Sequence, residues 1–229
     1  MKFSILIPVY NEKNYILDVL KRVNAQKTFF DLEIIVSDDG STDGTKELLR
    51  NNKDLYNHFI DAEKNQGKGV ALNKGIKLVS GDYILIQDAD FEYNPNDYRK
   101  VFKPAIECGA DIVYGSRFLG GEYVRLHFFW HYLANKILTT FTNIFTNLNM
   151  SDMETGYKLF KSEVLRSITI EEKSFGIEPE LTIKLAKKKF IFYEVPISYE
   201  GRSYQEGKKI RLKDAFIAIY CIVKYSILK

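Results

Sequence analysis

Short runs of β-branched and aliphatic residues alternate with longer amphipathic stretches through the first half of the chain. The apolar runs predict strands at 3–9, 33–37, 57–61, 83–87 and 111–115. Between them, apolar residues recur every three or four positions and predict helices at 13–25, 43–52, 67–79 and 96–108. Strands that alternate with helices build a mostly parallel sheet covered on both faces, so we expect an α/β, doubly wound fold.

The pattern changes after Arg117. Residues 126–148 predict a long helix that is rich in aromatic side chains and almost without charge, and an exposed surface of that kind needs a partner. The remaining patterns predict helices at 161–169, 178–188 and 211–228 and an edge strand at 190–199. Because we find no repeat or flexible linker, we expect one domain over 1–229 whose C-terminal helices are amphipathic and face a lipid surface or form a lid.

Composition narrows the class of protein. Cys108 and Cys221 lie far apart without metal-ligand spacing, which disfavours a disulfide framework or a structural zinc and favours a reducing cytosol. The N-terminal apolar run is too short for a signal peptide, and no stretch reaches the roughly 18 uncharged apolar residues of a membrane span. We therefore expect a soluble or peripheral protein.

Charge is distributed unevenly, although the net value is only +3. Residues 184–229 carry eleven Lys and Arg against four Asp and Glu. A basic segment attracts anionic lipid, phosphate or nucleic acid, but signatures of DNA- or RNA-binding motifs are absent, so we expect no nucleic-acid partner. A solvated surface is the simpler explanation of the same charges.

Polar motifs follow three of the predicted strands. They are Tyr10-Asn11-Glu12 after the first strand, Asp38-Asp39-Gly40-Ser41 after the second and Asp88-Ala89-Asp90 after the fourth. Sheets of this type bind ligands beyond the carboxyl ends of their strands, where the loops converge. The sequence therefore predicts a binding site lined by acidic strand ends.

Asp88 and Asp90 have the oxygen chemistry of a site for a hard divalent cation. Mg²⁺ and Mn²⁺ choose oxygen ligands, and one or two carboxylates plus substrate phosphates commonly complete the shell. Glu92 could add a third oxygen. Acidic residues also cap helices and turns, so this prediction depends on the position of the pair directly after an apolar strand.

The two other loops offer contacts for a nucleotide. Asp38 and Asp39 can accept hydrogen bonds from a base or ribose, while Ser41, Thr42 or Asp43 can cap the helix that follows. Gly67-Lys68-Gly69 opens another helix, where backbone N–H groups and the lysine could meet a phosphate. A simple turn before that helix is the alternative.

Taken in order along the chain, these motifs resemble those of the inverting glycosyltransferases of family 2, which have the GT-A fold. The resemblance is carried by IPVYNE (7–12), DDGSTDG (38–44), NQGKGVALNKG (65–75), DAD (88–90) and GSR (115–117). Within that family, ETGYKLF (154–160) and YEGRSYQEGKKI (199–210) look most like the polyprenyl-phosphate sugar synthases that make dolichyl-phosphate mannose or glucose. The resemblance spans essentially the whole chain.

The resemblance implies a role for individual residues and divides the chain into a nucleotide-sugar-binding half (1–117) and an acceptor half (118–229). Residues implied to contact the nucleotide sugar are Pro8, Tyr10, Glu12, Asp38, Asp39, Lys68 and Asp88. Residues implied at the metal are Asp88 and Asp90, with Glu92 where some relatives have Gln. Residues implied to bind donor or acceptor phosphates are Arg117, Arg202 and Lys208.

The aromatic helix departs from the mannose synthases, which carry an Arg there for the lipid phosphate. This chain has Trp130-His131-Tyr132 instead. His131 could donate a hydrogen bond to an acceptor phosphate, although a lone histidine on an apolar helix is more often a packing residue.

The acceptor decides whether the reaction needs a base. A hydroxyl group must lose its proton, whereas a phosphate monoester has a second pKa near 6 and is already an anion at pH 7. Asp152 and Glu154 are the candidate acids in the stretch where relatives place a catalytic Asp. Glu154 is our first choice and Asp152 the second; capping of the next helix is the structural alternative.

Three hypotheses follow. In the first, the chain uses Mg²⁺ or Mn²⁺ to move a sugar from a UDP- or GDP-linked donor to a polyprenyl phosphate, as a peripheral protein at the cytoplasmic face of the membrane. In the second, the acceptor is a hydroxyl group of a glycan or polysaccharide precursor. In the third, the chain is a catalytically silent module that binds sugar nucleotides. A homodimer that covers the apolar helices is compatible with all three.

Overall fold

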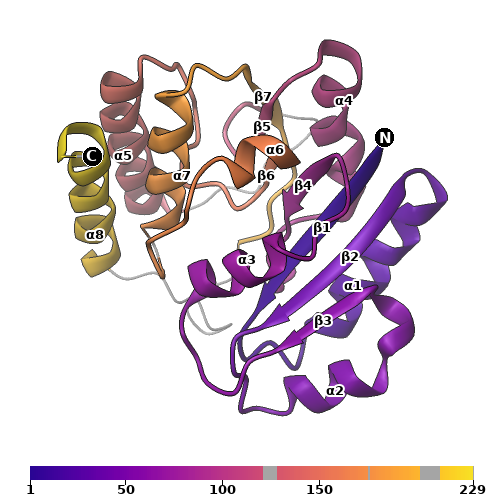
Figure 1. Ribbon diagram of the computed structural model, residues 1–229. Coiled ribbons are helices and arrows are strands. Elements are labelled where there is room, and N and C mark those ends of the chain that lie inside the picture. Colours follow the sequence, from indigo (N-terminus) through magenta and orange to yellow (C-terminus); the bar gives the residue numbers. More distant parts are fainter. Residues whose placement is uncertain (121–127, 175, 202–211, 229) are drawn as a thin grey trace.

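The computed structural model describes residues 1–120, 128–174, 176–201 and 212–228 (Figure 1). A seven-stranded sheet runs through the molecule in the order β3-β2-β1-β4-β6-β5-β7. The strands are β1 (Lys2–Val9), β2 (Asp31–Asp38), β3 (His58–Asp61), β4 (Tyr83–Ile86), β5 (Ile112–Ser116), β6 (Lys158–Lys161) and β7 (Phe192–Pro196). Only β6 runs antiparallel to its two neighbours; the other neighbouring pairs are parallel.

Helices occupy the segments between the strands. They are α1 (Ile16–Ala25), α2 (Thr45–Asn51), α3 (Lys68–Ile76), α4 (Tyr98–Cys108), α5 (Phe129–Thr146), α6 (Ser162–Arg166), α7 (Ile177–Ala186) and α8 (Leu212–Val223). Short 3₁₀ turns lie at Gln26–Thr28, Lys53–Leu55 and Pro95–Asp97, and a π-helical turn continues α8 over Lys224–Leu228. The predicted sheet flanked by helices is confirmed.

The sheet is buried on both faces, which explains why its strands are nearly continuous apolar runs. On β1, Ile5 and Ile7 belong to a core shared with α1 and α4. The intervening Leu6 belongs to a second core shared with α3, α6 and α7. Successive residues of a strand point to opposite faces, so one apolar strand supplies both cores.

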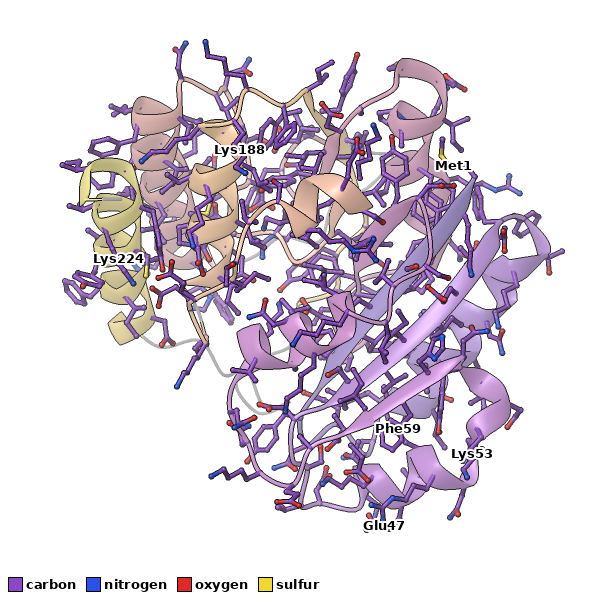
Figure 2. The ribbon with its side chains drawn as sticks, viewed as in Figure 1. Met1, Glu47, Lys53, Phe59, Lys188 and Lys224 are labelled. Carbon is purple, nitrogen blue, oxygen red and sulfur yellow. The ribbon has the colours of Figure 1, made fainter. Side chains whose placement is uncertain are left out.

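Beyond the second core, α5 and α8 pack against α7 and against each other (Figure 1). Lys224, which follows α8, lies on the opposite side of the molecule from Glu47 and Lys53 (Figure 2). None of the described helices is long and apolar enough to cross a membrane.

One strand departs from the sequence-based expectation. We did not predict β6, and the helix expected at 161–169 is the shorter α6. The strand has only four residues, Lys158 to Lys161, which is too short for a recognisable alternation. It exists because its backbone is sandwiched between β4 and β5, where Leu159 pairs with both Leu85 and Val113.

Candidate active site

The first two polar motifs meet beyond β1 and β2. These strands are parallel neighbours, with Val9 opposite Asp38. Asn11 adopts a left-handed conformation (φ 54°), its amide donates to Ser41 Oγ at 3.0 Å, and its Oδ1 accepts the amide of Thr42 at 2.8 Å. The amide of Glu12 donates to Thr45 Oγ1 at 3.1 Å. The loops are therefore joined to each other before any ligand binds.

The adjacent carboxylates of Asp38 and Asp39 accept hydrogen bonds from different loops. Asp38 Oδ1 accepts the amides of Gly40 at 3.0 Å and Ser41 at 2.9 Å, so this carboxylate shapes its own turn. Burial raises the pKa of Asp38 above its ordinary value. Asp39 instead accepts the amides of Gln66 at 3.0 Å and Gly67 at 2.6 Å, and so fixes the loop that leads into α3.

Lys68 is the first residue of α3 and lies between two carboxylates. Its Nζ is 2.9 Å from Asp88 Oδ1 and 3.3 Å from Glu178 Oε1. Burial alone would lower the pKa of Lys68, but the charges of Asp88 and Glu178 outweigh it and raise the pKa above the ordinary value. The lysine is therefore held in its charged form.

Asp88 also contacts the loop that precedes β6. A Cβ atom added to Gly156 would clash with Asp88 Oδ2, so this close approach requires glycine. The amide of Gly156 donates to the Tyr93 hydroxyl at 2.6 Å. The third acidic strand end and the candidate base region are thus adjacent.

The three acids predicted at the metal are not gathered into one cluster. Within the described ranges, no group of three or more His, Cys, Asp or Glu side chains is arranged to hold a metal ion. Glu92 Oε2 accepts the Tyr199 hydroxyl at 2.6 Å, while Asp90 Oδ1 accepts the Glu92 amide at 3.3 Å. Asp88 and Asp90 still supply oxygen donors that fit an ion completing its shell with phosphate and water.

Arg117 forms a two-pronged ion pair with Asp152. The guanidinium Nε and Nη2 atoms donate to the two carboxylate oxygens at 2.7 Å each, and the Arg117 amide donates at 3.0 Å. Asn135 of α5 adds a bond to Asp152 at 2.8 Å. Burial acts to raise the pKa of Asp152, but Arg117 more than offsets it and holds the pKa below its usual value. Asp152 therefore orients Arg117.

Glu154 lies in a different environment, only two residues away. Its Oε1 is buried and has no hydrogen-bond partner in the described part of the chain. Burial, followed by the charge of Glu178, raises the pKa of Glu154. The nearby Lys158 Nζ donates to the carbonyl of Met153 at 2.9 Å and to the carbonyl of Thr155. It is therefore hydrogen-bonded to the backbone on both sides of Glu154. Burial lowers the pKa of Lys158.

The other predicted residues are less tightly placed. Pro8 is near the end of β1, and Tyr10 is 39% exposed at the first loop. His131 lies in the first turn of α5, where its ring packs edge-on against Phe128 at 5.5 Å. Arg202 and Lys208 lie outside the described residues.

Several residues of the site were missed by sequence reasoning. They are Tyr93, Asn135, Lys158, Glu178 and Tyr199. The one local signal was the lysine inside the ETGYKLF motif, Lys158, which is the first residue of strand β6. The others stand in ordinary helical or loop contexts and become recognisable only through contacts distant in sequence.

Solved structures share this architecture. Glucosyl-3-phosphoglycerate synthase from Mycobacterium tuberculosis, crystallised with Mn²⁺, UDP and phosphoglyceric acid, aligns with a TM-score of 0.74 at 18% identity, over 99% of this chain and 78% of that one. Mannosyl-3-phosphoglycerate synthase from Rubrobacter xylanophilus aligns with a TM-score of 0.73 at 17% identity, over 98% and 73%. The sheet and its helices form a GT-A fold.

The sequence comparisons define the family. The profile described as Glycosyl transferase family 2 matches residues 4–169, and the chain belongs to this family of enzymes. A dolichol-phosphate mannosyltransferase from Pyrococcus furiosus is 30% identical over 100% of this chain and 64% of its own length. Glycosyltransferase AglJ from Haloferax volcanii is 31% identical over 86% of this chain and 63% of its own length. The chain thus spans a little under two thirds of these two relatives.

Membership in this family confirms the predicted class, a glycosyltransferase of family 2. The roles of individual residues stay predictions.

Proposed function

We propose that the chain transfers a sugar, with inversion, from a UDP- or GDP-linked donor to a polyprenyl phosphate at the cytoplasmic face of a membrane. The acceptor oxygen attacks the anomeric carbon while the bond to the nucleoside diphosphate breaks. The relationship to the dolichol-phosphate mannosyltransferase of Pyrococcus furiosus supports a lipid phosphate as acceptor. The division into a donor half (1–117) and an acceptor half (118–229) is part of the proposal.

The observation that carries the proposal is the double role of α5. Its N-terminal end exposes three consecutive aromatic residues, with Phe128 57%, Phe129 64% and Trp130 72% exposed. One and a half turns further on, the same helix sends Asn135 to Asp152, which in turn binds Arg117. A helix with apolar side chains facing outward and a polar side chain at the site suits an acceptor with an apolar tail and a charged head.

Asp88 and Asp90 are the residues proposed to hold Mg²⁺ or Mn²⁺ together with the donor diphosphate. When bound, such an ion supplies positive charge that stabilises the leaving diphosphate. Structural neighbours with the same fold were crystallised with UDP and with Mn²⁺ or Mg²⁺. Lys68 contributes a second positive charge from the N-terminus of α3, where backbone N–H groups also favour an anion.

A hydroxyl acceptor is the second candidate, and the state of Glu154 favours it. A raised pKa brings a carboxylate toward the range in which a general base works best at neutral pH. A phosphate acceptor needs no base, and there a neutral Glu154 would instead donate a hydrogen bond. Asp152 is the weaker candidate for a base, since Arg117 donates to both of its oxygens and Asn135 donates to Oδ1 as well.

A transfer assay tests the proposal. The full chain is incubated with UDP- and GDP-linked sugars, with Mn²⁺ or Mg²⁺ or with a chelator, and with or without a polyprenyl phosphate. We expect glycosylated lipid phosphate with one donor and loss of product on chelation. Transfer to sugars but not to the lipid phosphate, abolished in Glu154→Gln, would favour the hydroxyl acceptor instead.

Vesicle binding tests the proposed location separately from the chemistry. Wild-type protein should sediment with vesicles of anionic phospholipid at low salt and should be released as salt screens the charges. The double variant Phe128→Ser/Phe129→Ser should bind less, because two exposed aromatic side chains no longer enter the interface. Equal recovery in the supernatant with and without vesicles would contradict the membrane assignment, and a homodimer over α5 and α8 would then be examined by light scattering.

A further inference from the structure

Lys68, Asp88 and Glu178 form a chain of charges drawn from three separate elements. Lys68 begins α3, Asp88 follows β4, and Glu178 is the second residue of α7. The lysine Nζ lies 2.9 Å from Asp88 and 3.3 Å from Glu178. Their side chains are 28%, 21% and 14% exposed, respectively, so the group is mostly shielded yet open to a ligand.

The lysine has three N–H donors, and two of them face carboxylates. The third is available in the described part of the chain for an oxygen of a bound diphosphate. A lysine side chain has many rotamers, so its ammonium group binds a diphosphate well only if neighbouring groups hold it in one position. Asp88 alone cannot do so reliably, because it is also a proposed ligand of the divalent cation, which repels the ammonium.

Glu178 supplies the second anchor. The neighbouring acid on α7, Glu180, is used differently: it accepts the amides of Glu171 at 2.7 Å and Glu172 at 2.8 Å and holds that loop. The carboxylate of Glu178 pairs instead with Lys68, 110 residues earlier in the chain. The contact joins the donor half to the acceptor half at the site.

We propose that Glu178 is a positioning residue: it holds the Lys68 ammonium beside Asp88 so that the third N–H of the lysine binds the diphosphate of the donor. This inference rests on the proposed nucleotide-sugar donor. It assigns Glu178 no contact with the substrate itself. Its effect on the nucleotide is exerted through Lys68.

The direction in which Glu178→Gln changes nucleotide affinity distinguishes a positioning role from a purely electrostatic one. Glu178→Gln removes a negative charge near the place where an anionic diphosphate binds. If Glu178 acts only because its negative charge repels the diphosphate, UDP or GDP should bind more tightly to the variant. If Glu178 positions Lys68, the nucleotide should bind about tenfold more weakly, the size of one lost charge-assisted hydrogen bond.

The experiment is isothermal titration of the full chain with UDP and GDP in the presence of Mn²⁺, followed by ligand-observed NMR with uridine or guanosine. We expect weaker binding of the nucleotide to Glu178→Gln and unchanged binding of the nucleoside, which has no phosphate and therefore reports on the intact fold. In a Lys68→Met background, Glu178→Gln should cause no further loss of affinity.

A matched control is Glu172→Gln. Glu172 is also an acid near the start of α3, but its carboxylate pairs with Lys224 at 2.7 Å. This variant should bind the nucleotide like the wild type. Unchanged or tighter nucleotide binding by Glu178→Gln, or the same loss in the Lys68→Met background, would overturn the positioning role alone. Wild-type protein that binds neither UDP nor GDP would overturn the proposed donor and this inference together.

Discussion

Two regions of the site hold their carboxylates by different means. In the strand-end loops, defined here as residues 9–13, 38–45 and 65–68, the acids Asp38, Asp39 and Asp43 accept backbone amides of the loops. In the interior charge cluster of Arg117, Asp152, Glu154 and Lys158, carboxylates lie among side-chain cations. Backbone amides are present whatever the neighbouring side chains are, whereas each charge of the cluster depends on the others.

The comparison teaches where a substitution should affect function and where it should affect stability. Loss of a loop carboxylate such as Asp39 leaves the neutral backbone amides of the exposed Gln66 and the partly exposed Gly67 without an acceptor, but it leaves no charge without a partner. A member of the cluster that is lost leaves an uncompensated charge away from water, which is costly. The predictions below test this division, from the largest expected effect to the smallest.

Asp90→Ala should abolish most activity without unfolding the protein. We expect turnover to fall on the order of 10³-fold, equivalent to about 4 kcal/mol of transition-state stabilisation, because Asp90 is a proposed metal ligand outside both cores. Steady-state transfer rates and thermal melting of the same preparation measure the two quantities. Turnover like that of the wild type would contradict the metal role.

Arg117→Met should mainly destabilise the fold, in contrast to Asp90→Ala. The substitution leaves the fully buried Asp152 without its cation, and removing one partner of a buried pair costs about 3–5 kcal/mol. Urea unfolding gives the free energy directly. The matched control is Arg117→Lys, which keeps the positive charge but cannot bond both oxygens of Asp152 at once, and it should lose less unfolding free energy than Arg117→Met. Equal stability of the wild type and both variants would remove the distinction between the two regions.

Asp39→Asn should weaken donor binding more than it slows the chemical step. Its remaining oxygen can accept only one of the Gln66 and Gly67 amides well, so the loop before Lys68 loosens. We expect the KM for the donor to rise about tenfold with little change in kcat. The loop that Asp39 holds is proposed to bind the donor equally in the ground state and in the transition state. A reduced kcat with unchanged KM would instead place Asp39 at the reacting centre.

Glu154→Gln should change how stability depends on pH. The raised pKa means that the folded protein keeps the Glu154 proton at pH values where the unfolded chain has lost it, so this group's contribution to stability is present in acid and declines as pH rises above the ordinary carboxyl value of 4.5. The charged groups that act on it are Glu178, Lys158, Arg117 and Asp152.

The glutamine side chain does not titrate, so the stability of this variant relative to the wild type should increase between about pH 5 and pH 8, by about 1.4 kcal/mol for each unit by which the folded-state pKa exceeds 4.5. Urea unfolding of both proteins across this range provides the measurement. A constant difference in unfolding free energy would show that Glu154 titrates normally in the folded state.

Much of the fold could be predicted from the sequence because its information is local. Apolar runs and three- to four-residue spacing located strands β1 to β5 and helices α1 to α4 to within a few residues. The antiparallel strand β6 could not be found in this way, because its four residues become a strand only by lying between β4 and β5.

The candidate site shows the same limit. Asp38, Asp39 and Asp88 could be placed near one another since the carboxyl ends of neighbouring parallel strands meet at one edge. The grouping of Asp88, Asp90 and Glu92 at a metal could not be judged from their spacing. The hydroxyl of Tyr199, more than a hundred residues later, donates a hydrogen bond to the Glu92 carboxylate.

The sequence by itself determined the alternation of strands and helices, the order of the motifs and the family, since these depend on residue type and near neighbours. Only the tertiary structure decided that Asp152 is paired with Arg117, that Glu154 has a raised pKa and that Lys68 lies between Asp88 and Glu178. The physical reason is that ionisation depends on burial and on charges a few ångströms away. Those neighbours are brought together by packing between segments that are distant along the chain.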